Sequence, residues 1–339
     1  METLLEKATE ASIAKAAELL QQGEIVAIPT ETVYGIAASA FDGKAVKKIF
    51  EAKGRPQDNP LIVHIDRMEM LDGLVSQVPE GAKKLAKAFW PGPLTIIMPR
   101  GDKVADEVCA GLDTVAIRMP SHPVARAVIA ASGLPLAAPS ANLSGSPSPT
   151  CAHYVMSDMN GRLPLILDGG DCQVGVESTV ITLAGDTPML LRPGYITKEQ
   201  LEQVLGEEVV LSGAILAKLK EGETARSPGM KYKHYAPKAD VTIVKGDLAA
   251  FVAYVEQHKD EHTLCLCFTG ESDQLPVPCV EYGAQDSGAE QAHALFTALR
   301  RLDELGAKQV FARCPADTGV SLAVYNRLLR AAAFRVVEA

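Results

Sequence analysis

The stretch KGRPQDNPLIVHI, residues 53–65, decides how the first half of the chain is interpreted. It places two cations, Lys53 and Arg55, where a predicted helix ends at a glycine and a proline, and it then continues into a short apolar strand. Cations at a helix C-terminus complement the helix dipole, and this structural explanation is as good as a functional one while the pair stands alone. The interpretation therefore depends on the polar residues elsewhere in the chain.

Helix and strand patterns alternate on both sides of this stretch. Helical periodicity is predicted over 13–23, 44–53, 82–90, 122–133 and 197–206. Strands are predicted over 24–29, 60–65, 94–99, 114–119, 134–138, 165–168, 178–183 and 188–192. The alternation predicts an α/β domain with a large sheet, which we place at residues 1–210.

A second α/β unit is predicted after a segment with many turn residues. Residues 211–239 include RSPGMKYKHYAPK, which has no acidic residue and is predicted to link two domains. Residues 240–339 give the order β, α, β, α, β, α, which predicts a small domain with a parallel sheet. At 339 residues the chain is long enough for two hydrophobic cores.

The composition excludes several classes of protein. The net charge is −9 and the pI is about 5.4, so general attraction to nucleic acid or to an anionic membrane is not favoured. No apolar run approaches the roughly 18 residues of a membrane span, and no basic segment precedes an apolar one at the N-terminus. The seven cysteines contain no CxxC pair, which argues against a structural zinc site or a disulfide framework. We expect a soluble, cytoplasmic protein.

Familiar nucleotide and metal motifs give no alternative assignment. The chain has neither a GxxxxGK[ST] loop nor a GxGxxG turn after a strand. His258, Glu261 and His262 match the HxxEH pattern of some metalloproteases, but they stand in a charged stretch at the end of a predicted helix. We expect no metal there.

Polar residues with the chemistry of an anion site gather at the predicted strand ends. They are Thr30, Thr32, Thr114, Arg118, Ser140, Asn142, Ser178, Thr179 and Arg192. Guanidinium and ammonium groups bind phosphate or carboxylate oxygens, and hydroxyls and amides add neutral donors. Ligands of open α/β sheets bind at strand ends. The residues alone predict an anionic small-molecule site, although Arg118 could instead pair with a neighbouring acid and PSANLSGSPSP could be an ordinary loop.

A family resemblance makes this prediction specific. The motifs PTETVYGIAA, KGRPQDNPLIVHI, FWPGPLTIIM, TVAIRMPSHPVA, PLAAPSANLSG, ESTVI and LLRPG occur in order over residues 24–195. They resemble the YrdC-type domain of threonylcarbamoyl-AMP synthases, and SPGMKYKHYAPKA and SLAVYNRLLRAAA resemble the two-domain form of that family. The resemblance implies a YrdC-like twisted mixed sheet with helices, an active-site lid at 211–239, and a smaller Rossmann-like α/β domain at 240–339.

The resemblance also implies a reaction. The family makes L-threonylcarbamoyladenylate from L-threonine, bicarbonate and ATP and releases pyrophosphate, for the modification of adenosine 37 in tRNA. Mg²⁺ is expected on the ATP phosphates, held mainly by substrate oxygens and water, so that no protein metal site is implied. Transfers of this kind depend on positioning and on stabilising negative charge, which fits the absence of a nucleophile motif. The expected partners are the substrates and the downstream proteins that transfer threonylcarbamoyl to tRNA.

Residue by residue, the resemblance divides the site in two. It implies ATP binding by Lys53, Arg55, Asn59, Thr114, Asn142, Thr150, Arg192 and His234. It implies L-threonine binding by Thr32, His64, Arg118, Ser140 and Ser178. Lys53 and Arg55 are the expected catalytic residues, and Arg118 is the expected partner of the threonine carboxylate. Ser146 or Ser148 could take the place of Thr150.

Two rival functions stay open at this point. An RNA-binding module of YrdC type would need a basic face with interleaved aromatic residues, whereas the basic residues here are concentrated in the linker. A weak contact with tRNA is compatible with either function. The YrdC-like part of a hydrogenase-maturation carbamoyltransferase would bring zinc-finger segments, for which the paired CxxC spacing is lacking.

Overall fold

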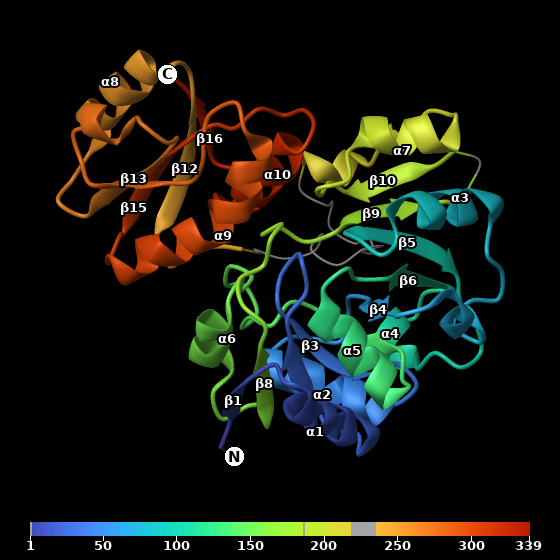
Figure 1. Ribbon diagram of the computed structural model, residues 1–339. Coiled ribbons are helices and arrows are strands. Elements are labelled where there is room, and N and C mark those ends of the chain that lie inside the picture. Colours follow the sequence, from blue (N-terminus) through green and yellow to red (C-terminus); the bar gives the residue numbers. More distant parts are fainter. Residues whose placement is uncertain (1, 186, 218–234) are drawn as a thin grey trace.

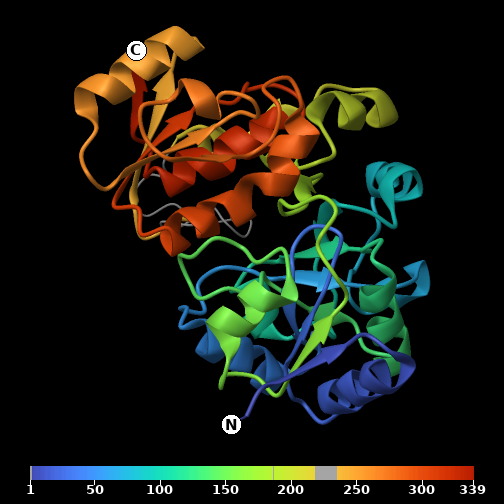
Figure 2. The ribbon, with the colours of Figure 1, turned by 60° about the vertical axis from the view of Figure 1, so that its left-hand side comes forward.

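The computed structural model describes residues 2–185, 187–217 and 235–339, which form two β-sheets and the helices that cover them (Figure 1). The first sheet has 11 strands in the order β1-β8-β2-β3-β7-β4-β6-β5-β9-β10-β11. The second has five strands in the order β14-β13-β15-β12-β16. The turned view in Figure 2 shows the second sheet and its helices stacked on one side of the first.

The first sheet mixes parallel and antiparallel pairs. Its strands are β1 (Leu4–Lys7), β2 (Val26–Ile28), β3 (Gly35–Ser39), β4 (Ile62–His64), β5 (Leu94–Pro99), β6 (Thr114–Arg118), β7 (Leu136–Ala137), β8 (Leu165–Asp168), β9 (Thr179–Thr182), β10 (Met189–Arg192) and β11 (Val210–Leu211). Its helices are α1 (Glu10–Gln21), α2 (Gly43–Lys53), α3 (Glu80–Phe89), α4 (Asp106–Cys109), α5 (Pro123–Ser132), α6 (Ala152–Met159) and α7 (Lys198–Leu205), with 3-10 turns at Met68–Leu71 and Gly213–Ile215.

Helices cover the two faces of this sheet unequally. On one face α2, α3, α4, α6 and α7 bury a large apolar core that includes Val63 of β4. On the other face α1 and α5 cover only the β2, β3, β7 and β8 region. Ile62, adjacent to Val63 and therefore on the opposite face, belongs to a separate small cluster with residues of β5, β6, β9 and β10. Among the described residues, no helix covers this second face near β4.

The second sheet is parallel throughout. Its strands are β12 (Asp240–Lys245), β13 (Thr263–Cys267), β14 (Cys279–Glu281), β15 (Gln309–Arg313) and β16 (Val336–Glu338). Its helices are α8 (Leu248–His258), α9 (Gly288–Glu304) and α10 (Ser321–Ala331), with a 3-10 turn at Ser272–Gln274. The expected mixed sheet followed by a smaller Rossmann-like unit is confirmed.

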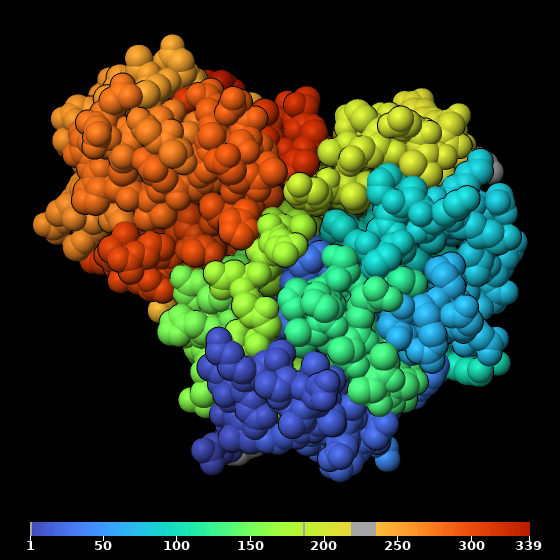
Figure 3. Space-filling view, in the orientation of Figure 1, coloured from blue at the N-terminus to red at the C-terminus, as the bar shows by residue number. Residues whose placement is uncertain are grey.

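The two units share an apolar core at their junction. Val33, Val174 and Val176 of the first unit pack in one cluster with residues of α9 and α10 and with Tyr235, whose ring lies 5.3 Å from that of Phe296. Figure 3 shows the second unit in orange and red seated against the green part of the first, with a notch between it and the yellow α7 region. The junction is therefore a packed interface over the loops next to β2 and β9.

Most predicted helices and strands are present, but several short elements were not predicted. These are β1, β3, β11, β14, β16, α4 and α6. β3 reads GIAAS, which has a glycine and three alanine or serine residues and lacks the β-branched, alternating pattern of a strand. Within residues 2–217 (apart from 186) and 235–339, none of the helices combines the length and apolarity required to cross a bilayer.

Candidate active site

The predicted anion-binding residues surround a cleft that lies across β4. Ile62 and His64 both line it, as expected for strand residues two apart, which share one face of the sheet. β6 runs parallel to β4 with Arg118 aligned with His64, and β7 runs antiparallel on the other side. The empty volume of the cleft, open mouth included, is about 750 Å³. The site is therefore built over the face of the mixed sheet that carries Ile62 and His64, and not only at one edge of strand ends.

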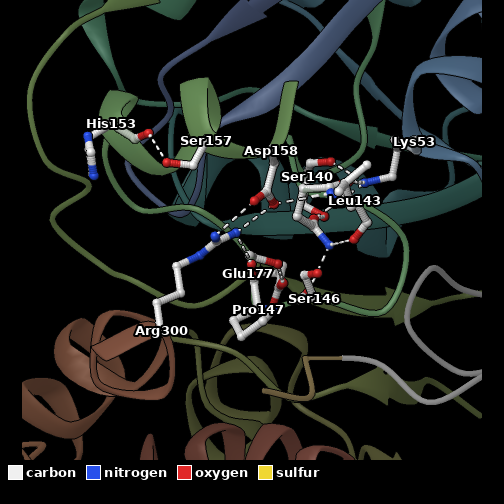
Figure 4. Close-up of polar contacts among 12 residues, drawn as sticks. Lys53, Ser140, Leu143, Ser146, Pro147, His153, Ser157, Asp158, Glu177 and Arg300 are labelled. Carbon is white, nitrogen blue, oxygen red and sulfur yellow. Dashed lines mark hydrogen bonds and ion pairs between the residues drawn. The ribbon is translucent and has the colours of Figure 1, made fainter. Parts of the chain in front are cut away.

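Lys53, at the end of α2, holds the loop that follows β7 (Figure 4). Its Nζ donates hydrogen bonds to the carbonyl oxygens of Ser140 and Asn142, the second over 2.8 Å, and lies 3.3 Å from Asn142 Oδ1. Gly54 ends the helix with a φ of +61°, a left-handed conformation that glycine adopts without strain. Burial, together with the charge of Arg55, lowers the pKa of Lys53 well below its usual value. A phosphate in the cleft would favour the charged ammonium again.

Arg118 is fixed by an acid that the sequence prediction left unassigned. Its Nη2 lies 2.7 Å from Oε1 of Glu31, and its Nη1 donates a 2.8 Å hydrogen bond to Oγ1 of Thr32. Glu31 also accepts a hydrogen bond from the backbone N–H of Ser121. Burial alone would raise the pKa of Glu31, but the Arg118 charge and the hydrogen bonds to the carboxylate together lower it. The guanidinium therefore enters the cleft wall already paired and oriented.

Ser178 lies between two polar side chains at the start of β9. Its hydroxyl is 2.7 Å from Oγ1 of Thr95 and accepts a 3.0 Å hydrogen bond from Nη2 of Arg192. Arg192 also donates from Nε to the Ser178 carbonyl. Burial lowers the pKa of Arg192 to about 10, so the group remains a cation at neutral pH. The antiparallel pairing of β9 and β10 brings these two residues together.

His64 supplies a neutral imidazole. Its Nδ1 lies 3.2 Å from the carbonyl oxygen of Ile62, and the side chain is almost fully buried. Burial, with the nearby charge of Arg118, lowers the pKa of His64 to about 3. At neutral pH the ring can donate or accept a hydrogen bond, but it carries no charge toward an anion.

Glu177 carries the only carboxylate among the described residues that line the cleft. Its Oε1 accepts a 2.5 Å hydrogen bond from the Ser148 hydroxyl, and its Oε2 accepts a 3.0 Å hydrogen bond from Nε of Arg327 in α10. Burial would raise the pKa of Glu177, but the charges of Arg327 and Arg192 lower it. A side chain of the second unit thus holds a residue of the cleft wall, without lining the cleft itself.

The cleft brings together most of the residues predicted from sequence. Those that line it are Lys53, Arg55, Asn142 and Arg192 of the ATP set and Thr32, His64, Arg118, Ser140 and Ser178 of the L-threonine set.

Three predicted residues, Asn59, Thr114 and Thr150, do not line the cleft, and a fourth is not described. Asn59 is fully buried and stands in the sequence between Arg55 and Ile62, which line the cleft. Thr114 begins β6 and Arg118 ends it, so the two are separated by about 13 Å at ~3.3 Å per residue. Thr150 is buried at the junction, where its hydroxyl is 3.0 Å from that of Thr297. His234 lies outside the described residues. The roles of these residues stay predictions.

Sequence reasoning missed two residues that the geometry makes relevant: Glu31 and Glu177. Both acids stand inside motifs that were recognised, PTETVYG and ESTVI, so their position was available although their ion pairs were not. Tyr235, which belongs to the predicted linker 211–239, lines the cleft and has a φ of +64°. The backbone N–H of the next residue donates to the carbonyl of Gly145 in the loop that Lys53 holds.

The described residues of the cleft offer few side chains that could bind a metal ion. The described part of the chain contains no group of three His, Cys, Asp or Glu side chains suited to one ion. Both oxygens of Glu177 are engaged. A divalent ion in the cleft would therefore take its ligands from a bound substrate and from water.

The HxxEH match lies at the end of α8 in the second unit, and both of its histidines contact other side chains. The His258 ring stacks on Tyr254 with centroids 4.0 Å apart, and its Nδ1 lies 2.8 Å from the Tyr254 carbonyl oxygen. His262 Nε2 is 3.0 Å from Nζ of Lys308.

Comparison with known families matches nearly the whole chain. Residues 18–194 match the Sua5/YciO/YrdC family model, which is described as "Telomere recombination". Residues 196–333 match the model described as "Threonylcarbamoyl-AMP synthase, C-terminal domain".

Individual relatives agree with these family matches. The chain is similar to a threonylcarbamoyl-AMP synthase of Pyrococcus abyssi, with 45% identity over 98% of this chain and 97% of the relative. It is similar to one of Bacillus subtilis, with 48% identity over 96% of this chain and 94% of the relative. A crystal structure of P. abyssi Sua5 complexed with L-threonine has a TM-score of 0.91 and 43% identity, and covers 100% of this chain and 99% of that one.

Proposed function

Because the chain belongs to the family of threonylcarbamoyl-AMP synthases, we propose that its cleft binds L-threonine beside Arg118 and the ATP phosphates beside Lys53, Arg55 and Arg192. The protein is an enzyme that makes L-threonylcarbamoyladenylate from L-threonine, bicarbonate and ATP, in the service of tRNA modification. The observation that carries the proposal is the gathering of four cations, Lys53, Arg55, Arg118 and Arg192, around one cleft.

The reaction asks for positioning and charge stabilisation. The threonine amine and bicarbonate give a carbamate and water, a carbamate oxygen attacks the α-phosphorus of ATP, and pyrophosphate leaves. Attack by one anion on another requires cations that compensate both, held in place before the substrates arrive. Lys53 and Arg192 are held in this way by backbone carbonyls of the cleft loops. We assign them and Arg55 to the charge that develops on the phosphates.

The threonine end of the cleft lies around His64 and Arg118. The guanidinium can accept a carboxylate, and Thr32, Ser140 and Ser178 offer hydroxyl groups within the same cleft. Neutral His64 can hydrogen-bond a neutral or anionic group without adding a charge. Val33, Ile62 and Ala138 supply apolar surface that could contact the threonine methyl group.

The remaining ATP contacts are proposed from the family pattern. They are Asn59, Thr114, Asn142, Thr150 and His234, of which Asn142 lines the cleft. Mg²⁺ is proposed to arrive with ATP and to be held by phosphate oxygens and water, in agreement with the shortage of available carboxylates among the described residues. The ion would neutralise phosphate charge; the residues named above orient the nucleotide.

The organisation of the chain supports a division of labour. We propose residues 1–210 as the catalytic domain, 211–239 as a linker that covers the nucleotide, and 240–339 as a C-terminal domain. Residues 218–234 of the linker lie outside the described residues. Tyr235 supports the lid assignment because it lines the cleft from the linker's end. A cytoplasmic location, transfer proteins that accept the adenylate, and at most a weak tRNA contact follow from a role in tRNA modification.

A binding module without synthase activity is not favoured. The relatives that match nearly the whole chain are synthases. The buried cations of the cleft are also directed at a small enclosed ligand, whereas RNA recognition uses an extended basic surface.

Calorimetric titration of L-threonine into the full chain tests the proposed site. Arg118→Ala and Ser178→Ala should each weaken binding on the order of tenfold to a hundredfold, because each removes a buried polar contact. Arg126→Ala, on the exposed side of α5, is the matched control and should bind normally. Unchanged affinity in folded Ser178→Ala and Arg118→Ala proteins would place threonine elsewhere.

A further inference from the structure

Two segments of the first unit that carry the proposed substrate contacts are joined by one arginine of the second unit. Arg327 lies in α10 and its side chain is completely buried. Its Nε donates to Glu177 Oε2 over 3.0 Å, and its Nη2 donates to the Glu177 carbonyl over 3.2 Å. Its Nη1 donates to the Pro193 carbonyl over 2.5 Å. One guanidinium therefore connects the segment just before β9, at Glu177, with the segment just after β10, at Pro193.

The two held residues are direct neighbours of residues assigned to the substrates. Glu177 precedes Ser178, and Pro193 follows Arg192. Ser178 and Arg192 are themselves hydrogen-bonded to each other through Nη2 and Oγ. A shift of either segment would move a threonine contact and an ATP contact at the same time. Arg327 itself does not line the cleft.

The charge of Arg327 has a second consequence, at Glu177. This buried carboxylate lines a cleft meant for phosphates and for a carbamate, where a net negative charge would repel the substrates. Ser148 and Arg327 hold its two oxygens. Without the guanidinium, the carboxylate would keep one neutral partner and the charge of Arg192. It would either take up a proton or draw Arg192 away from ATP.

We propose that Arg327 is a positioning residue of the synthase, through which the C-terminal domain sets the geometry and the charge of the cleft. The proposal rests on the proposed placement of threonine and ATP. It gives the C-terminal domain an indirect role in the reaction: Arg327 of α10 holds the segments next to β9 and β10 that carry the proposed substrate contacts. An arginine suits this position, since a planar group with several donors can reach Glu177 and Pro193 together, which a lysine ammonium does less well.

The same chain offers a matched comparison for a purely structural role. Arg313 is also buried, and its Nε lies 3.1 Å from both oxygens of Glu271, which is buried as well. This second arginine–glutamate pair lies inside the C-terminal unit and neither side chain lines the cleft. Loss of either arginine should lower the thermal stability. Only the loss of Arg327 should change how the enzyme handles its substrates.

The test is steady-state pyrophosphate release by full-length Arg327→Met, Arg327→Lys, Arg313→Met and Glu177→Gln/Arg327→Met, below the melting temperature of each. We expect Arg327→Met to lower kcat/KM for L-threonine and for ATP on the order of tenfold to a hundredfold, as for the loss of a charge-assisted hydrogen bond. KM for ATP should rise most, and adding Glu177→Gln should recover part of that rise. The kinetic constants of Arg327→Lys should lie between those of Arg327→Met and those of the unmodified enzyme.

The opposite outcome is equally clear. Kinetic constants within about twofold of the unmodified enzyme in Arg327→Lys and Arg327→Met, or losses equal to those of Arg313→Met, would reduce Arg327 to a structural residue. If Arg327→Met does not fold, the Arg327→Lys result decides. An unmodified chain that releases no pyrophosphate would instead contradict the proposed function, so the two failures are distinguishable.

Discussion

Arg118 and Glu31 form a buried ion pair at the threonine end of the cleft, with Nη2 and Oε1 2.7 Å apart and side chains 4% and 5% exposed. A threonine carboxylate that binds Arg118 would therefore meet a guanidinium that already has a negative partner. In a buried pair each charge depends on the other, and removal of one partner leaves the other uncompensated.

Replacing the acid should separate stability from substrate binding. We predict that Glu31→Gln melts at a lower temperature than the unmodified protein, because the Arg118 charge loses its partner. Saturating L-threonine should then raise the melting temperature more in the variant than in the unmodified chain, since the ligand carboxylate supplies the missing charge. Thermal denaturation with and without threonine measures both effects. An equal rise in the two proteins would exclude Arg118 as the carboxylate partner; Glu6→Gln, in a half-exposed pair with Lys15, is the control.

The cations at the end of α2 should be essential for turnover. We predict that Lys53→Ala and Arg55→Ala each lower kcat/KM on the order of a hundredfold or more, as for the removal of one charge-stabilising contact. Lys53→Ala should also destabilise the protein, because the buried carbonyls of Ser140 and Asn142 lose a donor. Lys44→Ala, exposed at the start of the same helix, should remain active. Near-normal turnover in both cleft variants would leave the pair as ordinary helix-end cations.

His64 should make stability sensitive to acid. Burial and the Arg118 charge lower the pKa of His64 from 6.5 to about 3, so between these pH values the unfolded chain binds a proton that the folded chain does not. Stability therefore falls as the pH drops below 6.5, by up to about 1.4 kcal/mol per pH unit from this group. His64→Gln should lose about 2 kcal/mol less than the unmodified protein between pH 7 and pH 5 in urea unfolding. His258→Gln, on the surface, should behave like the unmodified protein, and an identical pH dependence in His64→Gln would disprove the assignment.

The HxxEH stretch should have no role as a zinc site. His258 stacks on Tyr254, and one ring nitrogen of each histidine has another partner: His258 Nδ1 lies beside the Tyr254 carbonyl oxygen and His262 Nε2 beside the Lys308 ammonium. We predict no stoichiometric zinc in the purified protein by elemental analysis, and full activity in His258→Ala. One zinc per chain together with an inactive variant would show the motif to be functional.

Local sequence patterns could predict most of the framework of the site. The helix before Gly54, the strand that ends at His64 and the strand that ends at Arg118 all follow from periodicity and from turn residues. The family motifs then named nine of the residues that line the cleft. The GIAAS strand β3 could not be predicted in this way, because its small residues have low strand propensity and its burial comes from neighbouring strands.

Contacts between distant segments were beyond this reasoning. Glu177 and Arg327 are 150 residues apart, and nothing in either motif indicates the other. The Glu31–Arg118 pair likewise depends on how the loop after β2 folds over the end of β6. Thr114 stands at the opposite end of β6 from Arg118, and its predicted contact with ATP stays a prediction.

The central claim is synthesis of an adenylate from L-threonine, bicarbonate and ATP, and release of pyrophosphate measures it most directly. Purified full-length protein should release pyrophosphate from ATP in the presence of both L-threonine and bicarbonate, and release should drop to background when either is omitted. Release that is absent with all three substrates, or that proceeds equally well without threonine, would contradict the account.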